Sequence, residues 1–276
     1  MEKVKELAKK WYGILEFPSE SDERFYSLLE KTDGLYECDI KTYLEKDSEN
    51  KEKNAIMFLY FCEELSRQYK KRGIDEAVFY ESIKYLPDTL VKGDFKVDKD
   101  AWIVLSLKFE IFRLGRLQFQ MSKMYPEGKD GGFSEDTNII DVHIPADGGS
   151  ITPEVIDEAF SLAEEFFTKH FPEYEYKYYT CFSWMLDDNL REFLGDDTNI
   201  IKFQKRFNII HKREQDSIIH FLFKFGFTDR EEIREIEPKS EFARKIKEKA
   251  LAGGKFYNVL GYFERRFLYE KCVFLH

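Results

Sequence analysis

The feature that most constrains the fold is a change in the spacing of apolar residues near Gly115. Before about residue 95, apolar side chains recur at helical spacing, most clearly over residues 54–71. After Gly115, Leu117 and Met121 alternate with polar residues, as is typical of a strand. This change predicts an α+β protein: a helical N-terminal domain over residues 1–97, then a mixed β-sheet flanked by helices over residues 98–276.

The second part of the chain mixes both kinds of element. An amphipathic helix is predicted over residues 153–170, and strands over residues 138–144 and 176–185. Residues 200–210 and 218–225 are predicted to form a β-hairpin. Three further helices are expected, over residues 100–114, 187–194 and 240–251.

Composition narrows the function classes. Lys and Arg number 43 and Asp and Glu number 53, for a net charge of −10 that repels phosphate backbones and argues against nucleic-acid binding. The N-terminus lacks an apolar leader segment, and no apolar run is long enough to span a membrane, so neither secretion nor a membrane partner is expected. Widely spaced cysteines favour reduced thiols, no metal and a cytoplasmic location. These cysteines are Cys38, Cys62, Cys181 and Cys272.

Residues 142–154 predict a strand, a glycine-bearing loop and the start of a helix. Thr152 suits the N-cap of that helix, and Pro153 suits its first position. Unpaired N–H groups and small residues at such a helix start allow close approach of a phosphate. Two observations leave a plain chain reversal open: Glu154 and Asp157 already complement the helix dipole, and acidic side chains disfavour an anion there.

The stretches around this loop resemble the GNAT-like C-terminal domain of bacterial acyltransferase domain-containing proteins. The resemblance spans residues 101–276, and the helical first part is similar to the N-terminal domain of the same family. The matching stretches are residues 113–119 (RLGRLQF), 142–145 (VHIP), 151–154 (ITPE), 183–184 (SW), 186–187 (LD), 198–207 (TNIIKFQKRF) and 252–254 (AGG).

The resemblance implies a GNAT N-acetyltransferase fold and acetyl-CoA or another acyl-CoA as co-substrate. The family's phosphate turn begins with Arg or Gln, and here residues 146–152 lack that residue. Lys202 and Arg206 belong to a basic cluster that either meets the 3′-phosphate of CoA or forms a solvated strand face. The implied donor contacts are Ile144, Gly148, Gly149, Ser150, Thr152, Lys202 and Arg206.

Acyl transfer to an amine needs a base, because an ammonium must lose its proton before it attacks a thioester. Asp141 and His143 share one face of the predicted strand, and Cys181 and Ser183 share one face of another. If these strands are neighbours, we expect the four residues to surround an acyl pocket. The alternatives are a structural His–Asp pair and a buried cysteine that acts as a small apolar group.

Two function classes follow. The first is an acyl-CoA-dependent N-acyltransferase whose acceptor is a small-molecule or peptide amine, with the Asp141/His143 face handling the proton. The second is a catalytically inactive GNAT-like binding or protein-interaction module, which the missing Arg or Gln favours. Assembly into homo-oligomers is left open by the sequence.

Overall fold

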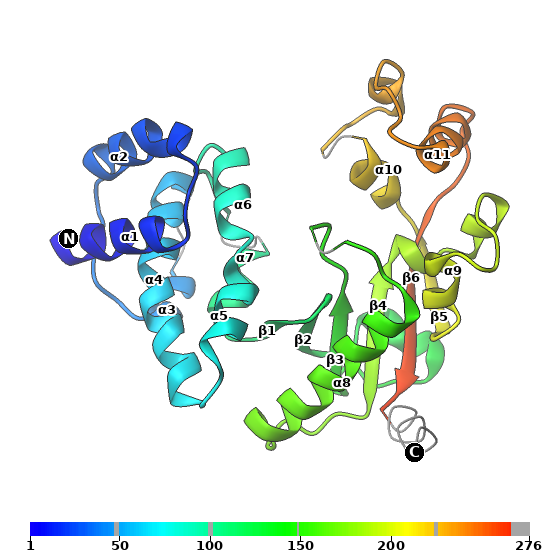
Figure 1. Ribbon diagram of the computed structural model, residues 1–276, viewed down its shortest axis with the longest axis horizontal. Coiled ribbons are helices and arrows are strands. Elements are labelled where there is room, and N and C mark those ends of the chain that lie inside the picture. Colours follow the sequence, from blue (N-terminus) through cyan, green and yellow to red (C-terminus); the bar gives the residue numbers. More distant parts are fainter. Residues whose placement is uncertain (47–49, 99–101, 148, 224–225, 266–276) are drawn as a thin grey trace. The chain divides into compact units, whose positions relative to one another are not determined.

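We describe the protein from a computed structural model, over residues 1–46, 50–98, 102–147, 149–223 and 226–265. The chain separates into two compact units, Met1–Leu114 and Gly115–His276. Figure 1 colours the first unit from blue to cyan-green, and the second from green to red. The domain boundary expected after residue 97 stays a prediction.

The first unit is built from helices, as predicted. Its longest helix, α4, buries residues on most of its circumference, including Phe58, Phe61 and Leu65. Stacked rings add to the core, with the Tyr12 and Phe25 centroids 3.8 Å apart. The elements are α1 (Glu2–Ile14), α2 (Asp22–Lys31), α3 (Ile40–Leu44), α4 (Lys51–Lys71), α5 (Glu76–Ile83), α6 (Leu86–Lys92), α7 (Ile103–Leu107), β1 (Ile111–Leu114) and the 3₁₀ turn η1 (Ser19–Ser21).

The helix expected over residues 100–114 is wrong in its second half. The helix α7 ends at Leu107, and Phe109 has a left-handed φ of 59°, which a helix does not tolerate. The following strand β1 is buried along its whole length. Phe109 and Phe112 both pack on Tyr69 of α4. Their spacing, which is also that of a helical stripe, therefore reflects contacts with another element and not a helix.

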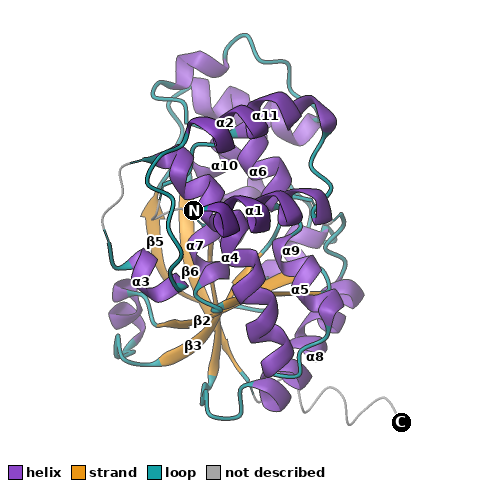
Figure 2. Ribbon diagram, turned by 90° about the vertical axis from the view of Figure 1, so that its left-hand side faces the viewer, coloured by secondary structure: helices purple, strands orange, loops and turns teal. Residues whose placement is uncertain are grey.

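The second unit contains most of a six-stranded sheet, whose strands are orange in Figure 2, and the strand order is β1-β2-β3-β4-β6-β5. The pair β3–β4 is parallel, while β2–β3, β4–β6 and β5–β6 are antiparallel, so the sheet is mixed, as predicted. The strands are β2 (Leu117–Lys123), β3 (Asn138–His143), β4 (Tyr178–Ser183), β5 (Asn208–Glu214) and β6 (Tyr257–Glu264).

Different segments cover the two faces of this sheet. Helix α8 (Pro153–His170) packs on one face, where Phe160 meets the rings of Phe119 and Tyr179. The segment 124–137, which contains the 3₁₀ turn η2 (Pro126–Gly131), crosses the other face and sets Phe133 against Tyr178. We call these the helix face and the loop face.

The hairpin expected over residues 200–225 is wrong. Residues 199–204 form helix α9 (Asn199–Gln204), and residues 217–222 form helix α10 (Ser217–Leu222). Strand β5 lies between them and pairs with β6, more than 40 positions later in the chain. A partner so distant leaves no local turn signal, so β6 was not foreseen.

The segment between β5 and β6 builds a small lobe with its own apolar core. Ile219, Ile233 and Ile246 are fully buried there. The predicted helix at residues 240–251 is confirmed as α11, with Ser240 as its N-cap. The remaining elements are α11 (Glu241–Leu251) and the 3₁₀ turns η3 (Trp184–Leu186), η4 (Asp188–Glu192) and η5 (Arg230–Ile233).

Candidate functional site

A row of polar side chains crosses the loop face of the central strands. Asp141 on β3 pairs with Gln120 on β2 and with Thr180 on β4, so these three residues lie side by side. The described pairing of β3 with β4 ends at Asp141 and Thr180, although the strands continue to His143 and Ser183. The row therefore lies where the parallel pair comes to an end.

Asp141 is the centre of this row. It is 1% exposed, and its two carboxylate oxygens accept hydrogen bonds from separate elements. Thr180 Oγ1 donates to Oδ1 at 2.7 Å, and Tyr125 Oη donates to Oδ2 at 2.5 Å. His143 Nε2 lies 3.3 Å from the same Oδ2. A buried carboxylate with several donors is satisfied as an anion.

The contacts of His143 fix which ring nitrogen carries the proton. Nε2 lies 3.0 Å from Gln120 Oε1 and 3.3 Å from Asp141 Oδ2, and both partners accept hydrogen bonds. These contacts favour the tautomer of the neutral ring in which Nε2 carries the proton and Nδ1 is the basic nitrogen. Burial lowers the pKa of His143, while the charge of Asp141 opposes this shift. The imidazole is thus neutral near pH 7 and able to accept a proton.

Cys181 and Ser183 do not join this group. Because neighbours along a strand point to opposite faces, both lie on the helix face, whereas Thr180 lies on the loop face with Asp141. Burial raises the pKa of the Cys181 thiol well above its ordinary value, so the thiol stays protonated. Ser183 Oγ accepts a hydrogen bond from the Met185 amide. The strands are neighbours, but the expected four-residue pocket is wrong.

The loop between β3 and α8 is held by Arg116, the residue directly before β2. Arg116 Nε donates to the Gly149 carbonyl at 3.0 Å, and its Nη1 donates to the Pro145 carbonyl at 2.8 Å. Gly149 has a φ of +76°, and a Cβ there would meet no atom within 4 Å. The turn therefore needs glycine for its backbone conformation, on a side with open space. Ile144 is half-buried at the end of β3, and Gly148 lies outside the described residues.

The other expected donor residues converge on the start of α8. Thr152 Oγ1 accepts from the Val155 amide, which confirms the predicted N-cap. Asn199 Nδ2, at the start of α9, donates to Ser150 Oγ at 3.1 Å. Lys202 lies on α9 and Arg206 just beyond it, so they do not form the solvated strand face considered from the sequence.

Basic side chains balance the two acidic residues of the first turn. Arg206 Nη1 pairs with Asp157 Oδ1 at 2.5 Å, and its Nη2 contacts the Pro153 carbonyl. Hydrogen bonding to its own amide lowers the pKa of Glu154, with a smaller contribution from the charge of Lys202. The ion pair of Arg206 with Asp157 therefore offsets part of the repulsion expected from these carboxylates.

Comparison with known proteins now bears on this geometry. The family model described as the GNAT-like C-terminal domain matches residues 111–263, which include both the Asp141 row and the start of α8.

This chain belongs to that family. The resemblance inferred from the sequence is confirmed, and so is the fold class. A search of curated proteins found no match.

Solved structures show the same fold. An acyltransferase in complex with decanoyl-CoA is 23% identical, with a TM-score of 0.73 over 93% of this chain and 87% of the other. An acyltransferase in complex with decanoyl-CoA and teicoplanin is 21% identical, with a TM-score of 0.70 over 93% and 87%. The similarity covers both units, so the helical unit and the GNAT-like unit each have a counterpart in these solved structures.

Several residues of the site were missed from the sequence. Gln120 lies in the polar alternation of β2, so its face was readable but its contact with His143 was not. Arg116 stands out in the sequence only as part of the matching stretch 113–119, whereas in the structure its guanidinium supports the turn. Tyr125 and Asn199 carry no local signal, because their partners lie on other elements.

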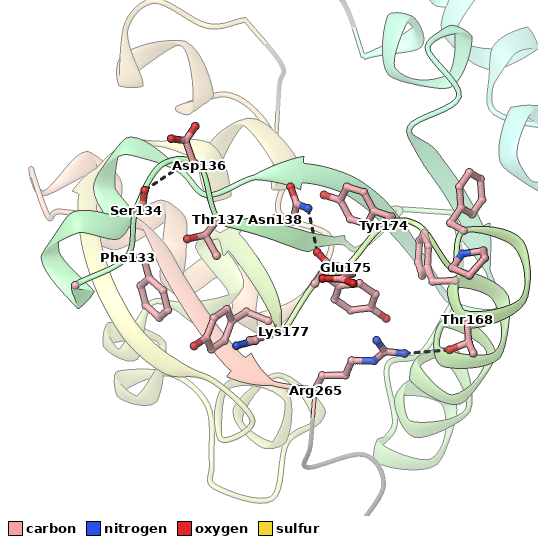
Figure 3. Close-up of a pocket in the computed structure, with 16 residues that line it drawn as sticks. Phe133, Ser134, Asp136, Thr137, Asn138, Thr168, Tyr174, Glu175, Lys177 and Arg265 are labelled. Atoms are coloured by element: carbon pink, nitrogen blue, oxygen red, sulfur yellow. Dashed lines mark hydrogen bonds between the residues drawn. The ribbon is translucent and has the colours of Figure 1, made fainter.

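An open cavity of about 750 Å³ lies elsewhere, at the beginnings of β3 and β4 (Figure 3). Arg265 donates to Thr168 at one side, and Asn138 donates to the Glu175 carbonyl near its middle. None of the residues expected at the site lines it. Within the described part of the chain, no helix is long and apolar enough to cross a membrane, and no cluster of side chains is arranged to hold a metal ion.

Proposed function

We propose that the protein is an acyl-CoA-dependent N-acyltransferase. The observation that carries the proposal is one continuous stretch, from Asp141 to the start of α8, that joins a neutral, hydrogen-bonded imidazole to a glycine turn at a helix start. Acyl transfer needs both parts, a base for the amine and a site for the donor's phosphates.

The donor's pyrophosphate is proposed to lie against the amides of Gly149 and Ser150, at the start of α8. In the described part of the chain, these amides donate to no other protein group. Lys202 and Arg206 act on Glu154 and Asp157 beside this turn, and so reduce the repulsion of the phosphates by these carboxylates. The similar structures that hold decanoyl-CoA and octanoyl-CoA support an acyl-CoA donor for this chain.

His143 is proposed to act as the general base. Its Nδ1 accepts a proton from the acceptor ammonium, directly or through one water. The amine nitrogen then forms a bond to the thioester carbonyl carbon, the C–S bond breaks, and CoA leaves as a thiolate that takes up a proton. Asp141 stabilises the imidazolium through Nε2.

The acceptor is proposed to be the amine of a small molecule or peptide. A similar structure contains teicoplanin, which supports a glycopeptide-sized acceptor. A cytoplasmic location remains part of the proposal, based on three thiols that are free in the structure, Cys38, Cys62 and Cys181. Cys272 lies outside the described residues.

Calorimetry with CoA, acetyl-CoA and decanoyl-CoA tests the donor site on the full chain. We expect saturable 1:1 binding of CoA, and tighter binding of whichever thioester the acyl site fits. Absence of heat with all three ligands at millimolar concentration would reject the proposal. Binding without CoA release across a panel of amines would instead favour a binding module.

A further inference from the structure

One carboxylate oxygen of Asp141 serves two partners. Oδ2 accepts from Tyr125 Oη at 2.5 Å and also faces His143 Nε2 at 3.3 Å. The other oxygen, Oδ1, accepts from Thr180 Oγ1. Tyr125 and His143 therefore share the charge of a single atom.

The Tyr125 hydroxyl acts as a hydrogen-bond donor. Burial, together with the charge of Asp141, raises the pKa of Tyr125, so the phenol stays protonated. Its ring lies edge-to-face with Phe182 on β4, at 5.2 Å between centroids, which limits its movement. Tyr125 belongs to the segment 124–137 on the loop face, so its hydrogen bond to Asp141 connects that segment to the polar row.

Asp141 is the charged group that faces the imidazole from β3, with Oδ2 at 3.3 Å from Nε2. From β2 the partner is the neutral amide of Gln120, and Thr180 on β4 is also neutral. Glu127 acts on Tyr125 from the segment 124–137, but it pairs with Arg213 at 3.1 Å. Cys181, on the opposite face, stays protonated.

We propose that Tyr125 is a positioning residue that weakens the electrostatic effect of Asp141 on His143. By donating to Oδ2, the Tyr125 hydroxyl withdraws part of the negative charge of the Asp141 carboxylate. Asp141 then selects the Nε2–H tautomer of His143 but does not stabilise a second proton on the ring. Nδ1 is thereby kept unprotonated. The catalytic meaning of this arrangement deepens, and rests on, the proposed function, whereas the arrangement itself does not depend on any ligand.

Long-range ¹H–¹⁵N NMR of the ligand-free protein labelled with ¹⁵N-histidine tests the proposal directly. His143→Gln assigns the signal of His143. We expect the Nε2–H tautomer in the wild type, and a higher titration midpoint for His143 in Tyr125→Phe, because Oδ2 then acts on the imidazole alone. Asp141→Asn should move the midpoint the other way.

Tyr174→Phe is the matched control. Its hydroxyl donates to the Ser122 and Ile139 carbonyls of the same sheet, whereas the hydroxyls that donate to Asp141 are those of Tyr125 and Thr180. We expect this variant to lower thermal stability and leave the His143 midpoint unchanged. If Tyr125→Phe does not fold, 3-fluorotyrosine at position 125, a stronger donor of the same shape, should lower the midpoint.

Two results would overturn the inference: an Nδ1–H tautomer in the wild type, or a His143 midpoint that stays or falls in Tyr125→Phe. Failure of the proposed function shows itself separately, as absence of CoA binding in calorimetry, and leaves these NMR results valid.

Discussion

The end of β3 and the start of α8 are neighbours along the chain but are built in opposite ways. At the end of β3, Asp141 is 1% exposed and its carboxylate is held by side chains. At the start of α8, Asp157 and Arg206 form an ion pair in which Asp157 is about half exposed, and the groups proposed to contact the donor are backbone amides. The first site depends on which residues are present, whereas the second depends on the path of the backbone.

This contrast predicts the largest effect for a side chain at the end of β3. His143→Ala should lower turnover by about 10²–10⁴-fold, because the base is lost. The measurement is release of CoA from a bound acyl-CoA with the best amine of a panel. Thermal stability should change little, since the ring is 22% exposed. Unchanged turnover would remove His143 from the mechanism and leave a structural His–Asp pair.

A backbone change at the start of α8 should come next. Gly149→Val places a β-branched residue at a φ of +76°, a strain of about 1–2 kcal/mol that the turn relieves by moving its amides. We expect CoA affinity to fall roughly tenfold, which corresponds to about 1.4 kcal/mol. The readout is calorimetry with CoA.

Gly253→Val is the control for that experiment. Gly253 has a φ of +79° and the same open surroundings, but it follows α11 in the small lobe. This variant should lose comparable stability and keep its CoA affinity. Equal affinity losses in both variants would mean that strain alone, not the position of the turn, explains the effect.

A smaller effect is expected on the stability of the fold at acidic pH. The pKa of His143 is lowered in the folded state, so the unfolded chain binds this proton first as the pH falls. Stability should therefore decrease from about pH 6.5 down to the lower folded-state pKa. Thermal unfolding of His143→Gln should show a shallower loss over this window than the wild type. Parallel curves for the two proteins would contradict the burial of a neutral imidazole.

The smallest effect is expected for Ser150→Ala. It removes the hydrogen bond from Asn199, an exposed contact worth about 0.5–1.5 kcal/mol, but it keeps the Ser150 amide. CoA affinity should change less than about threefold, which is under 1 kcal/mol. A tenfold loss in calorimetry would show that the side chain, and not the backbone, carries the contact.

The sequence predicted what depends on local spacing. The helices of the first unit, the strand β3 and the helix α8 with its Thr152 cap follow from periodicity and capping within each segment. Two of the failures involve distant partners. β5 was assigned to the wrong partner because β6 lies far along the chain, and the end of α7 was missed because Phe109 packs on Tyr69.

The candidate site divides in the same way. That Asp141 and His143 share a face follows from the period of a strand, and their contact is confirmed. Which face Cys181 takes depends on the register between β3 and β4, which one strand alone does not contain. Their roles in catalysis stay predictions.

The parallel pairing of β3 and β4 determines what an insertion in the loop between β3 and α8 would do. A crossover helix between parallel strands begins at the end of the sheet where the first strand finishes. The segment 143–153 thus sets the number of residues between His143, the proposed base, and the start of α8. An insertion there would lengthen this connection and leave both ends intact, so in the proposed mechanism the length of a single loop limits how the donor approaches the imidazole.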